Sequence, residues 1–107
     1  MTVRQPRVEI EYCTQCRWLL RAAWMAQELL TTFDTEIGEL ALVPGRGGVF
    51  EVRVDGVALW SRPPSGTFPD LAELKCLLRD RIAPQRHLGH SERRAREVGP
   101  SPSGPPT

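Results

Sequence analysis

The feature that most constrains this chain is a pair of cysteines, Cys13 and Cys16, placed where the hydrophobic period changes. Before the pair, residues 7–12 alternate between charged and apolar side chains, which is typical of a strand with one solvated face. After it, the apolar residues recur with a helical period, and we expect a helix over about 15–33. Both thiols therefore fall at a strand-to-helix turn, where unpaired backbone N–H groups and the helix dipole favour a thiolate. This position suits redox chemistry.

Length and charge exclude several classes of protein. The 107 residues allow one small domain, and the net charge of +1 gives no reason to expect a nucleic acid or an anionic membrane as a partner. The chain has no run of about 18 apolar residues, so no membrane-spanning helix is expected. Its start lacks the apolar core of a secretory signal. We therefore expect a cytoplasmic protein, in which a Cys-x-x-Cys pair indicates redox or metal chemistry and not a structural disulfide.

The rest of the chain predicts three more strands and a second helix. The strands are expected at 37–43, 48–54 and 57–62, and the helix at about 68–83. Thr67 is expected to cap this helix, with Asp70 completing a capping box.

A hairpin is predicted between the last two strands. Asp55-Gly56 suits a two-residue type I′ turn, whose two central residues both need a positive φ. Regular pairing outward from that turn places Val52 opposite Leu59 and Glu51 opposite Trp60. Trp60 is then expected on the open face of the sheet, although partial cover by a neighbouring strand or loop is an alternative.

These elements predict a two-layer α/β domain in the order strand, helix, three strands, helix. The strands have one charged face, so the helices should lie mainly on one side of a four-stranded mixed sheet. The first crossover should make the first two strands parallel. We place the domain at residues 1–91 and expect the Pro/Gly/Ser-rich tail at 92–107 to be disordered.

Two apolar side chains, Leu20 and Trp24, fall on the polar side of the first helix. They either pack on a loop, with Trp24 stacking on Arg17 or Arg21, or they form an exposed patch that docks a partner. Cys76 projects from the outer side of the second helix. It is either incidental or a site of glutathionylation or intermolecular disulfide formation.

Another candidate lies in the Gly-rich loop after the second strand. Arg46 there is either an anion-binding residue or part of a plain solvated loop.

Several motifs together point to a known family. They are Val-Glu-Ile-Glu-Tyr-Cys-Thr-Gln-Cys at 8–16, Gly-Gly-Val-Phe-Glu-Val at 47–52, the Asp-Gly turn followed by Leu-Trp-Ser at 59–61, Phe-Pro-Asp-Leu at 68–71 and Leu-Gly-His-Ser at 88–91. With them, roughly residues 7–91 resemble the selenoprotein W-like (Rdx; SelT/SelW/SelH) family, in a form with cysteine in place of selenocysteine. The resemblance implies a thioredoxin-like fold and a thiol-disulfide oxidoreductase role. It leaves the attacking thiol open, because the selenium position corresponds to Cys16 whereas the attacking cysteine of thioredoxins corresponds to Cys13.

The leading hypothesis is reversible disulfide formation between the catalytic residues Cys13 and Cys16. On the helix-dipole argument Cys13 attacks and Cys16, a turn inside the helix, resolves the mixed disulfide. Arg17 adds positive potential, and Tyr12 is expected to pack beside the motif. The substrates would be thiol or disulfide proteins, with glutathione as a thiol co-substrate and no other cofactor.

Two other classes of function stay open. One is a protein-interaction or redox-sensor module without turnover, which would use Leu20, Trp24 and Trp60 as contacts. The other is a metal-binding module that joins the thiol pair to His87 or His90, although a structural zinc site usually has four N or S ligands. The chain is expected to be a monomer or a weak dimer.

Overall fold

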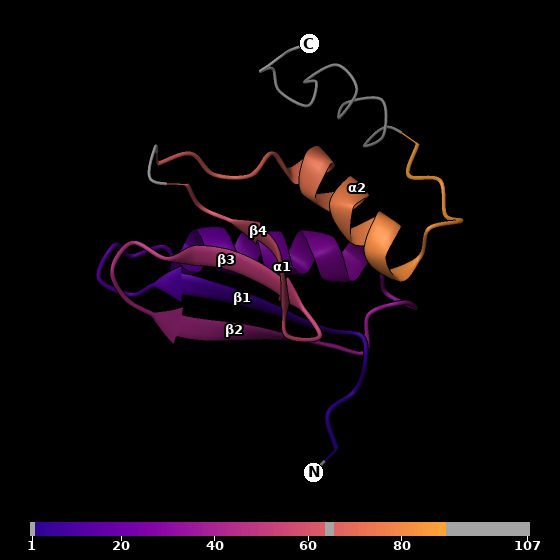
Figure 1. Cartoon of the computed structure of the whole chain (residues 1–107), viewed down its shortest axis with the longest axis horizontal. Helices are drawn as coiled ribbons and strands as arrows, with labels where there is room; N and C mark the ends of the chain where they lie inside the picture. Colours follow the sequence, from indigo (N-terminus) through magenta and orange to yellow (C-terminus); the bar gives the residue numbers. More distant parts are fainter. Residues whose placement is uncertain (1, 64–65, 90–107) are drawn as a thin grey trace. The chain divides into compact units, whose positions relative to one another are not determined.

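The computed structural model describes residues 2–63 and 66–89, so the predicted tail at 92–107 lies outside the described residues (Figure 1). Its elements follow the predicted order and are β1 (Arg7–Cys13), α1 (Leu19–Thr32), β2 (Glu39–Gly45), β3 (Phe50–Val54), β4 (Val57–Ser61) and α2 (Leu71–Ile82). The chain divides into two compact units at residue 68. The sheet and α1 belong to the first unit, and α2 belongs to the second.

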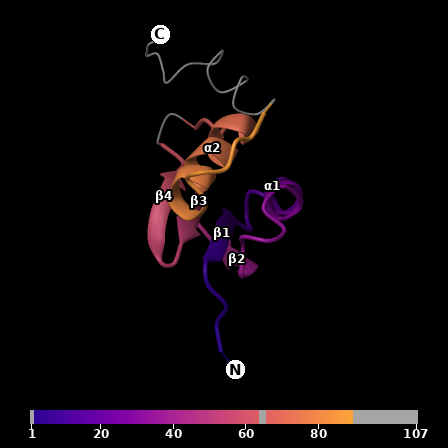
Figure 2. The same cartoon turned by 90° about the vertical axis from the view of Figure 1, so that its right-hand side faces the viewer.

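The sheet has the strand order β2-β1-β3-β4, with β1 in an interior position. β1 pairs parallel with β2 and antiparallel with β3, which confirms the predicted mixed sheet; in Figure 1 the arrows of β1 and β2 point the same way. Val8, Ile10 and Tyr12 are buried on one face of β1, as its alternation predicted. Helix α1 lies against one face of the sheet (Figure 2) and buries Ala22, Met25, Ala26 and Leu29.

Helix α1 begins later than the sequence indicated. It starts at Leu19, not near residue 15, because the preceding residues form a turn in which Arg17 N–H donates to the carbonyl of Thr14 at 3.1 Å. Arg17 has a φ of +61°, a left-handed conformation that a right-handed helix cannot contain. The prediction that Cys16 lies a turn inside the helix is therefore wrong. Both cysteines precede α1.

The β3–β4 hairpin has the predicted turn but not the predicted register. Asp55 and Gly56 both have positive φ, at +49° and +83°, as a type I′ turn requires. A bulge then shifts the pairing, so that Val52 faces Trp60 where regular pairing predicted Leu59. Since a one-residue shift moves side chains to the opposite face, Trp60 lies on the same face as Val52. The expectation that Trp60 lies on the open face is wrong.

Helix α2 is capped by Asp70, whose carboxylate accepts a hydrogen bond from the backbone N–H of Glu73 at 3.2 Å. The predicted cap at Thr67 is wrong. Phe68 precedes a proline, and a residue in that position is sterically kept out of the helical region, so the helix cannot begin there.

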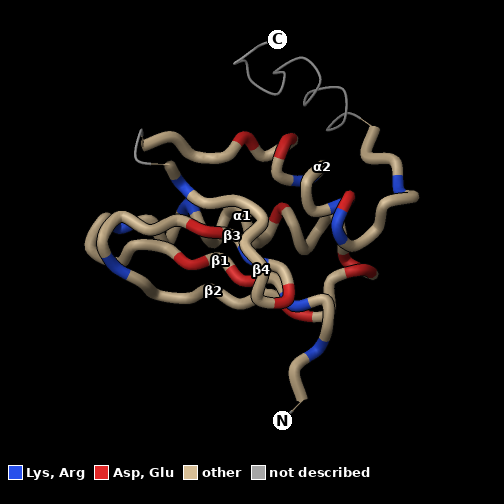
Figure 3. Tube along the Cα trace, in the orientation of Figure 1, with Lys and Arg blue, Asp and Glu red and all other residues tan. Residues whose placement is uncertain are grey.

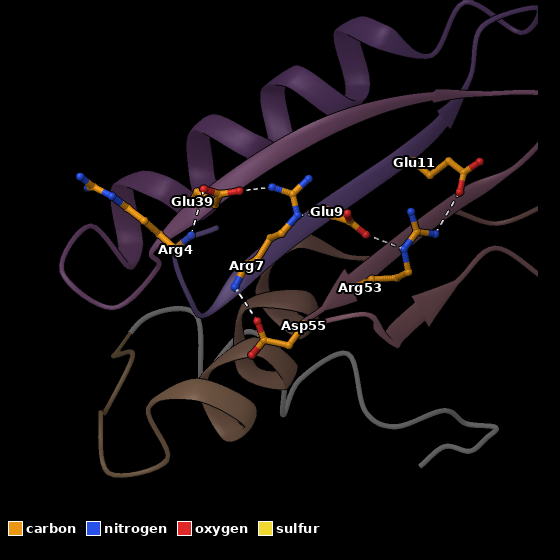
Figure 4. A network of polar contacts seen from close by, with 7 residues as sticks. All are labelled: Arg4, Arg7, Glu9, Glu11, Glu39, Arg53 and Asp55. Carbon is orange, nitrogen blue, oxygen red and sulfur yellow. Dashed lines mark hydrogen bonds and ion pairs between the residues drawn. The ribbon is translucent and has the colours of Figure 1, made fainter. Parts of the chain in front are cut away.

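Charged residues on the open face of the sheet form a network centred on Arg53 (Figure 4). Glu11 of β1 lies directly opposite Glu51 of β3, a pairing that like charges make unfavourable. The Arg53 guanidinium contacts both, at 2.9 Å from Glu11 and 3.2 Å from Glu51, and also reaches Glu9 at 2.9 Å. Its hydrogen bond to Glu9, with help from Arg7, lowers the pKa of that carboxyl group. Arg53 is therefore what allows three carboxylates to share one surface.

Replacing Arg53 should destabilise the domain in a pH-dependent way. A carboxyl group with a lowered pKa stabilises the fold above its unfolded pKa, and the contribution is lost as the pH falls through the folded value. We expect Arg53→Met to lower the free energy of unfolding by roughly 1–3 kcal/mol at pH 7. The loss should be smaller at about pH 2, well below the ordinary pKa of a glutamate, because the contribution of Glu9 disappears as the pH falls through its lowered pKa.

Urea unfolding at both pH values, followed by tryptophan fluorescence, measures this difference. The exposed Arg46, which has no ion pair among the described residues, gives a matched control: Arg46→Met should change stability by less than about 0.5 kcal/mol. An Arg53→Met loss that is the same at both pH values would contradict the role given to the network.

Candidate functional site: a thiol pair at the end of the central strand

Cys13 is the last residue of β1, and its position there determines the geometry of the site. It pairs in register with Gly45 of β2 and is fully buried. The carbonyl of Gly45 accepts hydrogen bonds from the backbone N–H of Thr14 at 3.0 Å and from its hydroxyl at 3.1 Å, which attaches the turn to β2. A side chain at residue 45 would crowd this junction, because its Cβ would lie 2.8 Å from a methyl carbon of the short, branched Val49 side chain. The buried thiol is thus held by backbone contacts.

Cys16 lies in the turn that follows and is exposed to solvent. The turn brings its sulfur back to within 2.7 Å of the Cys13 sulfur, and Cys16 donates the hydrogen bond. Both residues are thiols in this structure. A disulfide needs a sulfur–sulfur distance of about 2.05 Å, so only a small movement separates the pair from bond formation.

The contact between the sulfurs shifts the pKa values of the two thiols in opposite directions. The hydrogen bond donated by Cys16 lowers the pKa of Cys13, and the same bond raises the pKa of Cys16. Backbone N–H groups of Gly48, Cys16 and Gln15 add to the lowering at Cys13, and together they outweigh the burial that opposes it. These donors come from the turn and from the β2–β3 loop. The helix dipole invoked from the sequence is therefore not needed to explain the lowered pKa of Cys13.

Arg62 supplies the cation of the site. Its charge acts to lower the pKa of Cys16, against the larger effects of Cys13 and of burial. The guanidinium donates to the carbonyl of Gly48 at 3.5 Å and lies over the ring of Trp18, 4.8 Å from the centroid. Arg62 follows the bulge in β4, and its backbone N–H bonds to the carbonyl of Phe50. The bulge therefore places Trp60 and Arg62 on the side of Phe50.

An aromatic cluster supports this end of the sheet. Trp18 packs edge-on against Phe68 at 4.9 Å and Phe50 at 6.4 Å, and Phe50 in turn meets Phe68 and Trp60. Trp18 comes two residues after Cys16, so the cluster fixes the chain just beyond the thiols. Aromatic pairs of this geometry contribute about 0.5–1.5 kcal/mol each beyond their buried area.

A cavity of about 500 Å³ lies beside the turn. It brings together three of the residues that sequence reasoning associated with the thiols, Tyr12, Arg17 and Leu20, and adds Thr14 and Leu19. Leu20 is 83% exposed. Trp24, one turn further along α1, is 49% exposed, and Arg21 stacks on Phe68 instead of on Trp24. The cavity has the size of small ligand sites.

Other candidate residues lie elsewhere or stay untested. His90 is outside the described residues, and His87 is exposed, with its ring accepting a hydrogen bond from the N–H of Gly89. Cys76 lies in α2 and is partly exposed. Within residues 2–63 and 66–89, no three His, Cys, Asp or Glu side chains are grouped so that they could hold a metal ion.

Sequence reasoning missed Arg62 and Gly48. The Gly-Gly pair in the loop was visible, but nothing in it signalled an N–H group aimed at the thiols. Regular pairing would place Arg62 on the open face together with Trp60, and only the bulge moves both of them. A bulge in a short strand leaves no residue signature here, because the residues beside it are all compatible with regular pairing.

The fold and the thiol pair define a class of protein. A parallel strand–helix–strand unit, with two cysteines at the end of its first strand and an antiparallel hairpin after it, is a thioredoxin-like domain with a dithiol site. No helix in the described part of the chain is long and apolar enough to span a membrane.

Comparison with known proteins places the chain within that class. Residues 7–80 match the sequence profile of the Rdx family, and the chain belongs to this family. A crystal structure of a protein from Bordetella parapertussis is 58% identical, with a TM-score of 0.68 over 71% of this chain and 96% of that one. The selenoprotein W-related protein from Vibrio cholerae is 50% identical, with a TM-score of 0.67 over 71% and 95%. A search of curated proteins found no match. Membership of the family implies a redox-related role.

Removing Cys13 tests whether its hydrogen bond raises the pKa of Cys16. Cys13→Ala deletes both the acceptor and the negative charge that raise the pKa of Cys16, so the pKa of Cys16 should fall. Iodoacetamide labelling of Cys16 against pH, in a Cys76→Ser background with the labelled peptide identified by mass spectrometry, should therefore show its midpoint at lower pH. Leu20→Ala, which shortens an exposed side chain of α1, should leave the midpoint in place. A midpoint that stays or rises in Cys13→Ala would refute the proposed hydrogen bond.

Proposed function

We propose that this protein is a thiol-disulfide oxidoreductase in which Cys16 attacks the substrate and Cys13 resolves the mixed disulfide. This order is the reverse of the one expected from the helix-dipole argument, which assumed that Cys16 lies inside the helix. The observation that carries the proposal is the geometry of the pair: two thiols 2.7 Å apart, of which one is exposed and the other fully buried. Only Cys16 is open to a substrate sulfur. Cys13 contacts the Cys16 sulfur but is closed to solvent, so a substrate cannot reach it directly.

The acidities of the pair favour the resolving step, and the first attack needs a proton transfer. The hydrogen bond donated by Cys16 lowers the pKa of Cys13 and raises the pKa of Cys16. Transfer of the Cys16 proton to Cys13 makes Cys16 the nucleophile at the moment of attack. Because the donor and acceptor are already in contact, the transfer needs no movement of the chain.

The reaction then balances in two exchanges. The Cys16 thiolate attacks one sulfur of a substrate disulfide, which forms the mixed disulfide and releases the first substrate thiolate. That thiolate takes the proton from Cys13. The Cys13 thiolate next attacks the Cys16 sulfur, forms the Cys13–Cys16 disulfide and releases the second substrate thiolate. The substrate gains two electrons and the protein loses two. A cellular thiol such as glutathione is the proposed reductant that restores the pair.

Trapping with single-serine variants tests both the activity and the order of attack. Cys13→Ser removes the resolving thiol, so mixed disulfides should accumulate on Cys16 and be released by dithiothreitol. Cys16→Ser leaves only the buried thiol and should trap little. Both variants are made in a Cys76→Ser background, so that Cys76 contributes no adduct. Trapping by Cys16→Ser alone would reverse the assignment, and no trapping by either variant would refute the proposed activity.

A second candidate function is a redox-responsive docking module without turnover. The observation in its favour is the exposure of Leu20 and Trp24 on α1, which leaves two apolar side chains in solvent one to two turns from the thiols. Single exposed apolar residues are common on protein surfaces, but a pair on one helix next to a reactive site is a candidate contact.

Truncation of Trp24 distinguishes docking from a structural role. Trp24→Ala should lower the affinity of the protein for a partner identified by trapping by about 10-fold or more, as expected for an interface tryptophan. This affinity is measured for the non-covalent complex. Its free energy of unfolding should fall by less than about 1 kcal/mol, because half of the side chain is already in solvent. Calorimetric titration and urea unfolding give the two values. A large loss of stability would instead identify Trp24 as part of the core.

A further inference from the structure

Four arginines surround the thiol turn, and we call them the arginine rim: Arg17, Arg21, Arg46 and Arg62. Arg17 follows Cys16 directly, and Arg46 follows the glycine that pairs with Cys13. Arg62 bonds to the β2–β3 loop at Gly48. Arg21 and Arg62 lie over the same aromatic ring, that of Phe68.

None of the rim arginines has a carboxylate partner among residues 2–63 and 66–89. The glutamates of the sheet are instead engaged by Arg7 and Arg53. Figure 3 shows blue segments around the end where β1 and β2 finish, together with red segments of the strands, whose carboxylates Arg53 engages. The thiol end is therefore positive although the whole chain carries a net charge of only +1.

Two of these cations are held in place before any ligand arrives. The Arg21 guanidinium lies 4.0 Å from the centroid of the Phe68 ring, and that of Arg62 lies 5.3 Å from the same ring and 4.8 Å from the Trp18 ring. Stacking on aromatic faces fixes a guanidinium while leaving N–H donors for other acceptors. Binding of a carboxylate to such a guanidinium costs less entropy, because the arginine side chain is already ordered.

The cavity beside the turn adds an apolar contact to this charge. Leu19, Leu20 and Tyr12 line it together with Arg17 of the rim. A ligand that occupies it therefore meets apolar surface and a cation at once, within two residues of Cys16. The combination fits a peptide segment, in which apolar and acidic side chains alternate along one backbone.

We infer that the substrate is an acidic peptide segment in which the reactive cysteine has Asp or Glu residues on both sides and an apolar residue next to it. The inference rests on the proposed function, since the cysteine is the one whose disulfide Cys16 attacks. The carboxylates lie on the rim, and the apolar side chain enters the cavity. The chemistry is the two-step exchange given above: the substrate disulfide is broken, the Cys13–Cys16 disulfide is formed, and two electrons pass to the substrate.

The test uses three peptides that differ only in charge. Each contains Leu-Cys, flanked by Asp, Asn or Lys on both sides, and each cysteine is disulfide-linked to 2-mercaptoethanol, which is uncharged. The rate constant for single-turnover reduction by the reduced Cys76→Ser protein is measured at ionic strengths of about 0.02 M and 0.5 M. We expect the Asp peptide to react about 10-fold faster than the Asn peptide at low salt, and the difference to disappear at high salt. The Lys peptide should be the slowest.

Matched variants assign the preference to the rim. Arg17→Asn combined with Arg46→Gln removes two of the four rim charges and should lower the Asp-to-Asn rate ratio by about threefold. Asparagine suits the left-handed conformation at residue 17. Arg4→Gln removes an exposed arginine near the start of β1, at the opposite end of that strand, and should keep the ratio (Figure 4).

The possible outcomes separate the two proposals. If all three peptides are reduced at equal rates, or if the double variant keeps the wild-type ratio, the acidic-substrate inference is overturned while the oxidoreductase activity stands. If no peptide is reduced and the serine variants trap nothing, the oxidoreductase proposal fails and the inference fails with it.

Discussion

The register between Cys13 and Gly45 is the constraint on which the rest of the site depends. Because Cys13 is the last residue of an interior strand, its sulfur is buried and its position is set by the sheet on both sides. The chain must then turn at once, and it does so by hydrogen bonding Thr14 to the same glycine carbonyl. The turn returns Cys16 to the buried sulfur while keeping it in solvent. One pairing in the sheet thus produces a buried and an exposed thiol in contact, which is the asymmetry a two-step exchange requires.

The bulge in the β3–β4 hairpin also determines the geometry of the site. With regular pairing, Trp60 and Arg62 would face the charged side of the sheet, near the glutamates that Arg53 engages. The shift of one residue places Trp60 against Phe50 and brings Arg62 over the ring of Trp18. Bulges are common beside active sites because they re-aim a side chain and bend the strand locally. In this chain the re-aimed side chain is a cation next to a pair of thiols.

The sequence alone predicted the features that depend on local chemistry. The Asp55-Gly56 turn, the alternation of β1 and the parallel crossover all follow from rules that act within a few residues, and all three are confirmed. The start of α1 was not predictable in this way. Residues 16–18 carry no helix breaker, and the left-handed conformation of Arg17 arises from the turn that Cys13 and Thr14 impose.

The predictions of the α2 cap and of the position of Trp60 were wrong for related reasons. Thr67 and Asp70 both have capping side chains, and the proline after Phe68 decided between them. For Trp60, the hairpin turn fixed only the nearest pairs, and the bulge beyond them depends on packing across the sheet. The cavity beside the turn was equally hidden, although three of its lining residues had been singled out. Local rules therefore identified the reactive groups, whereas their surroundings required the tertiary structure.

The distribution of charge links the stability of the fold to the chemistry of the thiols. Arg53 and Arg7 neutralise the glutamates of the sheet, so these carboxylates do not compete for the arginines at the thiol end. The positive potential that remains acts on two kinds of anion, the thiolate of the pair and any carboxylate of a substrate.

Yet the pKa of Cys16 is raised, because the effect of the adjacent Cys13 exceeds that of Arg62. In the proposed reaction the exposed thiol has to pass its proton to Cys13 before it attacks, and the rim arginines are available for the carboxylates of the inferred substrate. A protonated exposed thiol is also a poor target for adventitious oxidants, since oxidation proceeds through the thiolate. In the proposed reaction, this geometry would protect the attacking thiol until a substrate disulfide is bound beside it.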